Sequence, residues 1–311
     1  MHADIARWKY FDNVSMADRE RGFALVHGED VAGFIGLIPV EFSNGSRSIH
    51  GCWACDWSVS HTVRGAYGLQ LLNAAQRSSD ATVALGGADV TRKILSRISP
   101  TCDGSAGLVF RKHVTLSGIA MALKRRGVLP ASLQLGSLNR FPIPRFRSYR
   151  NAVNVSQGLE HIRHDSLSAI SSEGKFQPSY THADLEWRLL RCPGLETWSC
   201  ETRHSEASAL AWRSRETPEE WKAALLVSAG SEEAISDCIE CCLRLIEHQG
   251  GGSVNTLVSR VDKAIISSLA HAGFRRLDFE YPLYNLTSAS SQINTVARLS
   301  YLDSDIYYRF A

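Results

Sequence analysis

The stretch CWACDWSV (52–59) decides the fold, together with the turn VRGAYG (63–68) and the run LQLLNAA (69–75) that follow it. The first segment predicts a strand and the last predicts a helix. A basic turn with glycines between a strand and a helix N-terminus can hold an anion, because free backbone N–H groups and the helix dipole face the ligand. We therefore expect a phosphate-bearing ligand at residues 64–68.

Length and composition limit the number of domains, the partners and the location that can be expected. The chain has 311 residues, of which 44% are hydrophobic and 21% charged, which suits one large or two medium globular domains. The net charge of +2 gives no strong field, so binding to nucleic acid or to a membrane surface is not expected. The N-terminal sequence lacks the apolar core of a signal peptide, and no apolar run approaches the roughly 20 residues of a membrane span. We expect a cytoplasmic protein.

The eight cysteines predict reduced thiols rather than disulfides. Most lie in apolar strand or helix patterns, as Cys238, Cys241 and Cys242 do. Cys52 and Cys55 form a C-x-x-C pair, but no second pair with histidines follows at the spacing of a zinc finger. No metal site is expected.

The first half of the chain predicts a sheet flanked by helices. The segment 23–40 contains two β-rich runs around the turn HGED (27–30), and a second turn at 43–45 leads to 52–59, which gives an antiparallel meander. After the helix of 67–77, ATVALGG (81–87) predicts a buried strand, and a helix begins at Asp89. Residues 108–114 close the predicted sheet.

The second half repeats this order after an irregular, proline-containing stretch. DLEWRL (184–189) echoes DIARWKY (4–10), with Trp187 and Trp8 as matching anchors. Residues 223–229 and 234–246 then stand where the first half has its strand and helix. We place the boundary near 150, with domains at 1–150, including a connector at 115–150, and at 151–311.

The two halves differ at the turn between strand and helix. The first has Arg64, whereas the second has GSEE (230–233). Two glutamates would repel a pyrophosphate. Only the first half is therefore expected to bind one.

These features resemble the GNAT acyltransferase superfamily, and the doubled arrangement resembles tandem-GNAT sugar N-acyltransferases of bacterial surface-polysaccharide pathways. The likeness rests on GFIGLIPV (33–40), WACDWSV (53–59) ahead of Arg64, LGGADVTRKIL (85–95), LEWR (185–188) and YLDSDIYYR (301–309). It implies two GNAT-like domains, each a mostly antiparallel mixed sheet flanked by helices. It also implies transfer of an acyl group from acyl-coenzyme A to a nucleotide-linked amino sugar, as in O-antigen synthesis.

The resemblance assigns the coenzyme A contacts to two groups of residues. Backbone N–H groups at Trp57, Ser58 and Val59 would bind the pantetheine arm and the thioester oxygen, where amide donors aid catalysis. The turn would bind the pyrophosphate through Arg64, Gly65, Ala66, Tyr67 and Gly68. The usual R-x-x-G-x-G/A spacing is altered, because Gly68 follows Arg64 by four residues.

Candidates for acid and base follow from strand alternation. Cys52, Ala54, Asp56 and Ser58 are expected on one face, and Trp53, Cys55, Trp57 and Val59 on the other. Asp56 is charged in an apolar strand, so it is expected to act as the base or to orient the amine. The alternative is a carboxylate held by turn amides or by an arginine.

Further acceptor contacts are expected from both halves. Asp303 and Asp305 would share a face of a last strand and hold the amine or a sugar hydroxyl, or else lie at a solvated strand end. Pro39 and Trp53 complete the predicted set. The helix at 89–99 contains no tyrosine to protonate the leaving thiolate, so the general acid stays open.

Two other functions remain possible on the sequence. A Fem-like aminoacyl transferase shares the doubled fold but needs a basic surface for RNA, which the net charge of +2 disfavours. A non-catalytic scaffold would have lost donor binding in both halves. In the sugar reading the partners are two small molecules, acyl-coenzyme A and an amino-sugar nucleotide, with no nucleic acid and no membrane.

Overall fold

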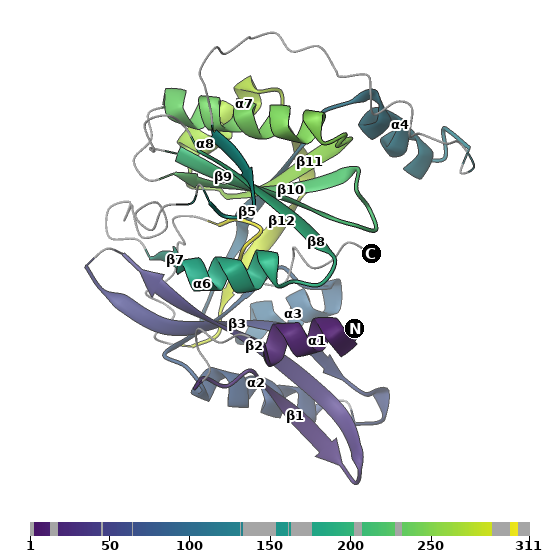
Figure 1. Ribbon diagram of the computed structural model, residues 1–311. Coiled ribbons are helices and arrows are strands. Elements are labelled where there is room, and N and C mark those ends of the chain that lie inside the picture. The colour runs from purple at the N-terminus through teal and green to yellow at the C-terminus, as the bar shows by residue number, and fades with distance from the viewer. Residues whose placement is uncertain are drawn as a thin grey trace.

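The computed structural model describes residues 3–12, 18–44, 46–63, 65–130, 132, 154–160, 162, 176–201, 207–227, 232–287 and 299–303. In this part of the chain, twelve strands join in one sheet flanked by helices on both faces (Figure 1). The strand order is β1-β2-β3-β4-β12-β5-β11-β10-β9-β8-β6, and β7 pairs with β2. The predicted fold class, a mostly antiparallel mixed sheet between helices, is confirmed.

The first half, residues 1–150, supplies most elements that sequence patterns predicted. Its elements are α1 Ala3–Tyr10, β1 Gly22–His27, β2 Asp30–Ser43, β3 Ser48–Val59, a 3₁₀ turn at His61–Val63, α2 Ala66–Arg77, β4 Ala81–Leu85, α3 Asp89–Ile98, β5 Thr101–His113 and α4 Leu116–Arg125. Helix α4 lies in the predicted connector, where its apolar residues form a regular helix that the nearby prolines concealed.

The second half, residues 151–311, repeats the strand and helix order. Its elements are β6 Asn154–Gln157, β7 Gln177–Ser179, α6 His182–Leu185 with a π-helical turn at Glu186–Leu190, β8 Leu195–Glu201, β9 Ala207–Ser214, β10 Glu220–Val227, α7 Glu232–His248, β11 Ser253–Ser259, α8 Lys263–His271 and β12 Arg275–Asn285. The boundary predicted near 150 lies outside the described residues and stays a prediction.

The two halves exchange their closing strands. In each half one pair of strands is parallel, β3 with β4 and β10 with β11. Strand β12 of the second half then lies between β4 and β5, antiparallel to both, and β5 of the first half lies between β12 and β11. Backbone hydrogen bonds therefore join the halves along the centre of the sheet.

Three apolar cores fill the space between the sheet and the helices. One core spans both halves on the face covered by α1 and α6, and includes Trp8, Trp53, Trp187 and Trp212. On the other face, α2 and α3 pack over the first half and α7 and α8 over the second. None of the eight cysteines forms a disulfide, and all except Cys102 are buried, as the apolar patterns predicted.

Candidate functional site

Strands β3 and β4 separate in the middle of the first half. They pair only at Gly51 with Ala81, Cys52 with Thr82 and Trp53 with Val83. Beyond this point β3 continues to Val59, but β4 ends at Leu85. The edge of β3 that faces β4 is thus left without a strand partner, which provides backbone groups for a ligand.

A β-bulge interrupts β3 beyond this separation. Asp56 and Trp57 together lie opposite the single residue Ile35 of β2. Asp56 has φ of 49°, and it is the one residue other than glycine with positive φ in the described part of the chain. Such strain in a bulge commonly re-aims side chains at functional sites.

The bulge overturns the simple alternation predicted for this strand. Trp57 and Val59 pack in the core under α2, together with Cys52. Cys55 belongs to the core under α1, and Asp56 points the same way, because the Tyr10 hydroxyl contacts both side chains. One extra residue turns every later side chain of the strand to the opposite face of the sheet. The prediction that Asp56 shares a face with Cys52 was therefore wrong.

Asp56 is held by two donors from α1. Lys9 Nζ lies 2.6 Å and Tyr10 Oη 2.5 Å from Asp56 Oδ2. The Lys9 side chain is 2% exposed, so this ion pair is shielded from water. Burial, with Cys55 and Asp56 nearby, raises the pKa of Tyr10 far above its ordinary value. This matches the alternative of a held carboxylate, with lysine in place of arginine.

Backbone N–H groups near the end of β3 point in two directions. Ser60 N donates to Ala32 O of the β1–β2 hairpin at 2.7 Å. Because N–H groups alternate along a strand, Ser58 N–H points toward β2, and Val59 N–H points to the edge that β4 has left. Of these two amides, both predicted to bind pantetheine, Val59 has the required direction.

Helix α2 begins next to this edge with its N–H groups uncapped. Gly65 precedes it with φ of 104°, a conformation that favours glycine, and no side chain caps the helix. Ala66, Tyr67 and Gly68 form the first turn, whose N–H groups have no partner within the helix. A Cβ on Gly65 would meet no atom within 4 Å, so the backbone is open to a ligand. Arg64 lies outside the described residues.

Gly68 has a packing role in addition to its place in the first turn. It is buried, and a Cβ there would lie 3.4 Å from Trp57 Cζ2 and 3.5 Å from Val59 Cγ2. The absence of a side chain lets α2 rest closely on the end of β3. The helix start and the bulged strand are thereby fixed relative to each other.

The corresponding place in the second half shares the strand separation, because β10 and β11 pair only from Glu220 to Ala223, but it lacks the bulge and has acidic residues at its helix start. Strands β10 and β9 pair without a register shift from Trp221 to Val227. Helix α7 begins with Glu232 and Glu233, both exposed, whereas the first turn of α2 contains no acidic residue. Negative charge at a helix N-terminus opposes a bound phosphate.

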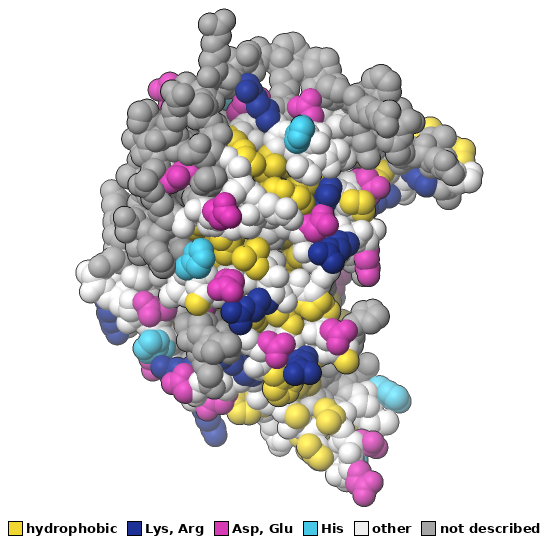
Figure 2. All heavy atoms as spheres, viewed as in Figure 1, with side chains coloured by type: hydrophobic (Ala, Val, Ile, Leu, Met, Phe, Trp, Pro, Cys, Tyr) yellow, Lys and Arg dark blue, Asp and Glu magenta, His cyan; other side chains and the backbone are white. Residues whose placement is uncertain are grey.

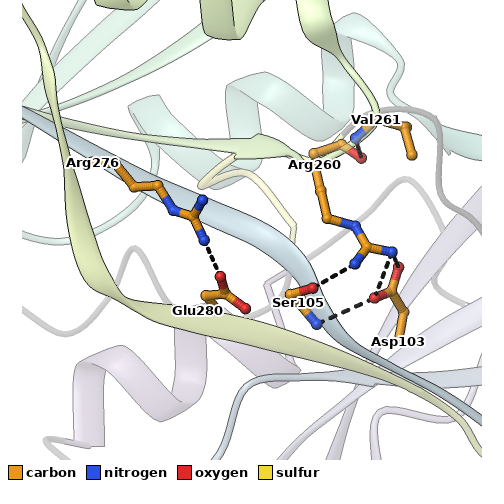
Figure 3. A network of polar contacts seen from close by, with 7 residues as sticks. Asp103, Ser105, Arg260, Val261, Arg276 and Glu280 are labelled. Atoms are coloured by element: carbon orange, nitrogen blue, oxygen red, sulfur yellow. Dashed lines mark hydrogen bonds and ion pairs between the residues drawn. The ribbon is translucent and has the colours of Figure 1, made fainter.

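The end of β11 also differs from the end of β4. Where Gly86 follows β4, Arg260 follows β11 and reaches across to β5. Its guanidinium donates to Ser105 Oγ at 2.7 Å and lies 3.3 Å from Asp103 Oδ1 (Figure 3). Arg260 thus joins the two halves.

Asp303 is buried in a turn rather than in a last strand. Residues 300–303 form a turn in which Ser300 N donates to Asp303 Oδ2 at 2.5 Å, and the Tyr180 hydroxyl donates to Oδ1. Desolvation raises the pKa of Asp303 to about 6, against the opposing effects of these donors and of Arg188. The strand prediction was wrong at 301–303, because local hydrogen bonds satisfy the carboxylate. Asp305 lies outside the described residues.

The other predicted acceptor contacts lie away from the end of β3 and the start of α2. Trp53 is 0% exposed and packs edge-on against Phe42 with ring centroids 5.5 Å apart. Pro39 lines a cavity of about 20 Å³ beside His50 and Ser79. These residues border the opposite end of β3 or the core, so the structure does not bring them together with Val59 and Gly65.

Tyr281 is a candidate that sequence reasoning missed. It comes from β12, and its ring packs on the backbone of Gly86, where a Cβ would lie 2.7 Å from Tyr281 Cδ1. Gly86 has φ of 77°, and its N–H donates to Pro282 O at 2.9 Å. A tyrosine of the second half thus lies at the end of β4. It lies there because β12 pairs with β4, and a local sequence pattern cannot predict such a pairing.

The described residues give no sign of a metal site or of a membrane span. They hold no cluster of three or more potential metal ligands. No helix among them is long and apolar enough to cross a bilayer. On the face shown in Figure 2, acidic and basic side chains are interspersed rather than gathered by sign.

Comparisons with known proteins agree on the fold. No family model matches the chain, and no curated protein matches it. Solved structures do match. N-myristoyltransferase of Saccharomyces cerevisiae with bound myristoyl-CoA and inhibitors aligns at TM-score 0.53 and 11% identity, over 92% of this chain and 72% of that one.

Two bacterial structures align equally well. A GCN5-related N-acetyltransferase from Kribbella flavida has TM-score 0.52 and 14% identity, over 92% of this chain and 66% of its own. A probable N-acyltransferase from Enterococcus faecalis V583 has TM-score 0.53 and 8% identity, over 88% and 62%. At these identities the matches show that the chain has the fold of these N-acyltransferases.

Proposed function

We propose that this chain transfers an acyl group from acyl-coenzyme A to an amine. The observation that carries the proposal is the coincidence, in the first half alone, of three features around the end of β3. They are the separation of β3 from β4, the bulge at Asp56, and the uncapped start of α2 at Gly65. The fold shared with an N-myristoyltransferase, a GCN5-related N-acetyltransferase and a probable N-acyltransferase supports the same proposal.

The chemistry assigns a distinct task to each backbone feature. The first turn of α2 and Arg64 would bind the pyrophosphate, as helix N-termini bind anions. Val59 N–H would donate to the thioester oxygen, on which negative charge develops when the amine attacks. The new C–N bond forms as the C–S bond breaks. The amine nitrogen gives up a proton to water in the site, and the leaving thiolate takes a proton.

Two side chains complete the proposed reaction. Asp56, bound by Lys9 and Tyr10, would act as a positioning residue that fixes the bulge and with it Val59. Tyr281, packed on Gly86 at the end of β4, would protonate the leaving thiolate. This second role would come from the second half, which otherwise supplies a wall of the acceptor site.

For the acceptor, we propose the amino group of a nucleotide-linked amino sugar. This finer assignment rests on the sequence resemblance to tandem-GNAT sugar N-acyltransferases. A cytoplasmic enzyme of surface-polysaccharide synthesis would follow from it. An aminoacyl-tRNA acceptor gains no support from the mixed charges of the visible face (Figure 2).

Release of free thiol tests the proposal. The protein would be incubated with acetyl-, hydroxyacyl- and long-chain acyl-coenzyme A in turn, each with a panel of amino-sugar nucleotides. We expect thiol release with at least one pair, and an acylated sugar by mass spectrometry. Coenzyme A binding without turnover on the whole panel would overturn the sugar assignment alone. Absence of both binding and turnover would favour a non-catalytic scaffold.

A further inference from the structure

Two arginines oppose each other at the centre of the sheet. Arg111 of β5 and Arg275 of β12 are direct partners in an antiparallel pair. Directly opposed side chains share a face, and like charges there destabilise a sheet. At the other end of the same strand pair, the opposed residues Thr101 and Asn285 are neutral and hydrogen-bonded at 2.8 Å.

No carboxylate neutralises this arginine pair within the described residues. Arg111 Nε donates to Asn255 Oδ1 at 2.6 Å, and Arg275 is exposed. Glu220, on β10 two strands away from β5, is instead paired with Arg125. The nearest polar partner of the pair is therefore a neutral amide.

The positive charge continues along a row across the sheet. Asn255 of β11 is the partner of both Arg111 and Lys222 of β10. Lys222 is 9% exposed, and its ammonium lies 5.2 Å from the centre of the Tyr301 ring. His113 lies two residues after Arg111 on the same face, and burial together with the charges of Arg111 and Arg275 lowers its pKa. Its buried Nδ1 has no hydrogen-bond partner in the described part of the chain.

We infer that the row of Lys222, Asn255, Arg111 and Arg275 binds a phosphate group of a small ligand. Two guanidinium groups with free donors match the oxygens of a phosphate, and an ammonium adds a third charge. A bound dianion would remove the repulsion between the arginines.

This site is separate from the one proposed for the thioester. Leu283 of β12 pairs with Leu85 at the end of β4, and Arg275 lies eight residues earlier in the same strand. At about 3.3 Å per residue the two places are about 25 Å apart. The phosphate site therefore does not depend on acyl transfer.

The test measures pyrophosphate binding by calorimetry at constant ionic strength, with one equivalent of coenzyme A present to fill the site at the start of α2. Arg275→Gln is compared with Arg276→Gln, because Arg276 is the adjacent arginine and pairs with Glu280 (Figure 3). We expect the Kd of Arg275→Gln to rise about tenfold or more, as for the loss of a charge-assisted hydrogen bond, and that of Arg276→Gln to stay near wild type.

Two further readouts keep the test decisive. Without ligand, Arg275→Gln should melt no lower than wild type, because a repulsion is removed. Malonate should bind more weakly than pyrophosphate. The inference fails if the wild type does not bind pyrophosphate, if both arginine variants bind it alike, or if malonate binds equally well. Failure of coenzyme A to bind would affect only the proposed function, because the two variants can still be compared.

Discussion

Trp8 and Trp187 bind each other reciprocally across the two halves. Trp8 Nε1 donates to Trp187 O at 2.8 Å, and Trp187 Nε1 donates to Trp8 O at 2.9 Å. Their rings stack with centroids 5.4 Å apart. Each tryptophan is followed by a buried cation, Lys9 or Arg188. Lys9 binds Asp56, whereas Arg188 donates to Leu302 O, so one repeated motif serves the bulge in one half and the C-terminal turn in the other.

The tryptophan pair should couple the stability of the two halves. Trp8→Phe removes one indole donor and leaves a buried carbonyl unpaired, so we expect a loss of about 2 to 4 kcal/mol in the free energy of unfolding. A double-mutant cycle with Trp187→Phe, measured by urea denaturation, should give a coupling energy of at least about 0.5 kcal/mol. Additive losses would contradict a shared interaction.

Gly36 is required by the contact between α1 and the bulged strand. A Cβ at this position would lie 2.0 Å from Tyr10 Oη. Gly36→Ala should displace Tyr10 from Asp56 and destabilise the protein by about 2 kcal/mol, with a drop in thiol release. Gly104→Ala is a matched control, because a Cβ there meets no atom within 4 Å. Equal effects of the two substitutions in thermal unfolding would contradict the account of the bulge.

The buried carboxyl of Asp303 should give stability a characteristic pH dependence. Its folded pKa, raised to about 6, exceeds the ordinary value of 3.8, so the native state binds the proton more tightly than the unfolded state does. This contribution is fully present below about pH 4 and is lost as the pH rises through 6, by about 3 kcal/mol in total. In urea denaturation between pH 4 and 7, Asp303→Asn should lack this loss. A parallel pH profile of wild type and variant would show that Asp303 is not the group responsible.

Tyr281 should affect catalysis more than binding. Tyr281→Phe keeps the ring on Gly86 and removes the hydroxyl, so we expect kcat to fall about tenfold to a hundredfold while coenzyme A affinity is retained. Acyl donors with a more acidic thiol should recover part of the rate. Phe279→Leu is a suitable control, since Phe279 contacts the Tyr281 ring edge-on but has no hydroxyl that could protonate the thiolate. Unchanged kcat in Tyr281→Phe would exclude it as the acid.

Local patterns predicted the fold better than the site. The apolar runs of β3, β4 and β11 and the helical spacing of α2 and α7 were visible in the sequence, because burial of one face imposes its period. Strand β12, RRLDFEYPLYN (275–285), was missed, since charges and Pro282 conceal it. Proline is tolerated there at a register shift, which a sequence does not reveal.

The site residues that follow from neighbouring residues in the sequence were predicted better than those that depend on contacts between distant segments. The glycine turn at 65–68 does begin a helix beside the end of β3, as its residue types predicted. The face predicted for the Asp56 side chain was wrong, because a bulge adds one residue to the strand and leaves no recognisable pattern in the sequence. Tyr281 and the Lys9 contact depend on pairings between distant segments, which strand periodicity cannot specify.

The stoichiometry and location of coenzyme A binding test the central claim most directly. Isothermal titration should show one coenzyme A per chain. Gly65→Ala should weaken binding, because φ of 104° strains any side chain, whereas Gly194→Ala, at φ of 76° with nothing within 4 Å, should leave affinity unchanged. Undetectable binding, two sites per chain, or equal affinities in the two variants would contradict a single coenzyme A site at the start of α2.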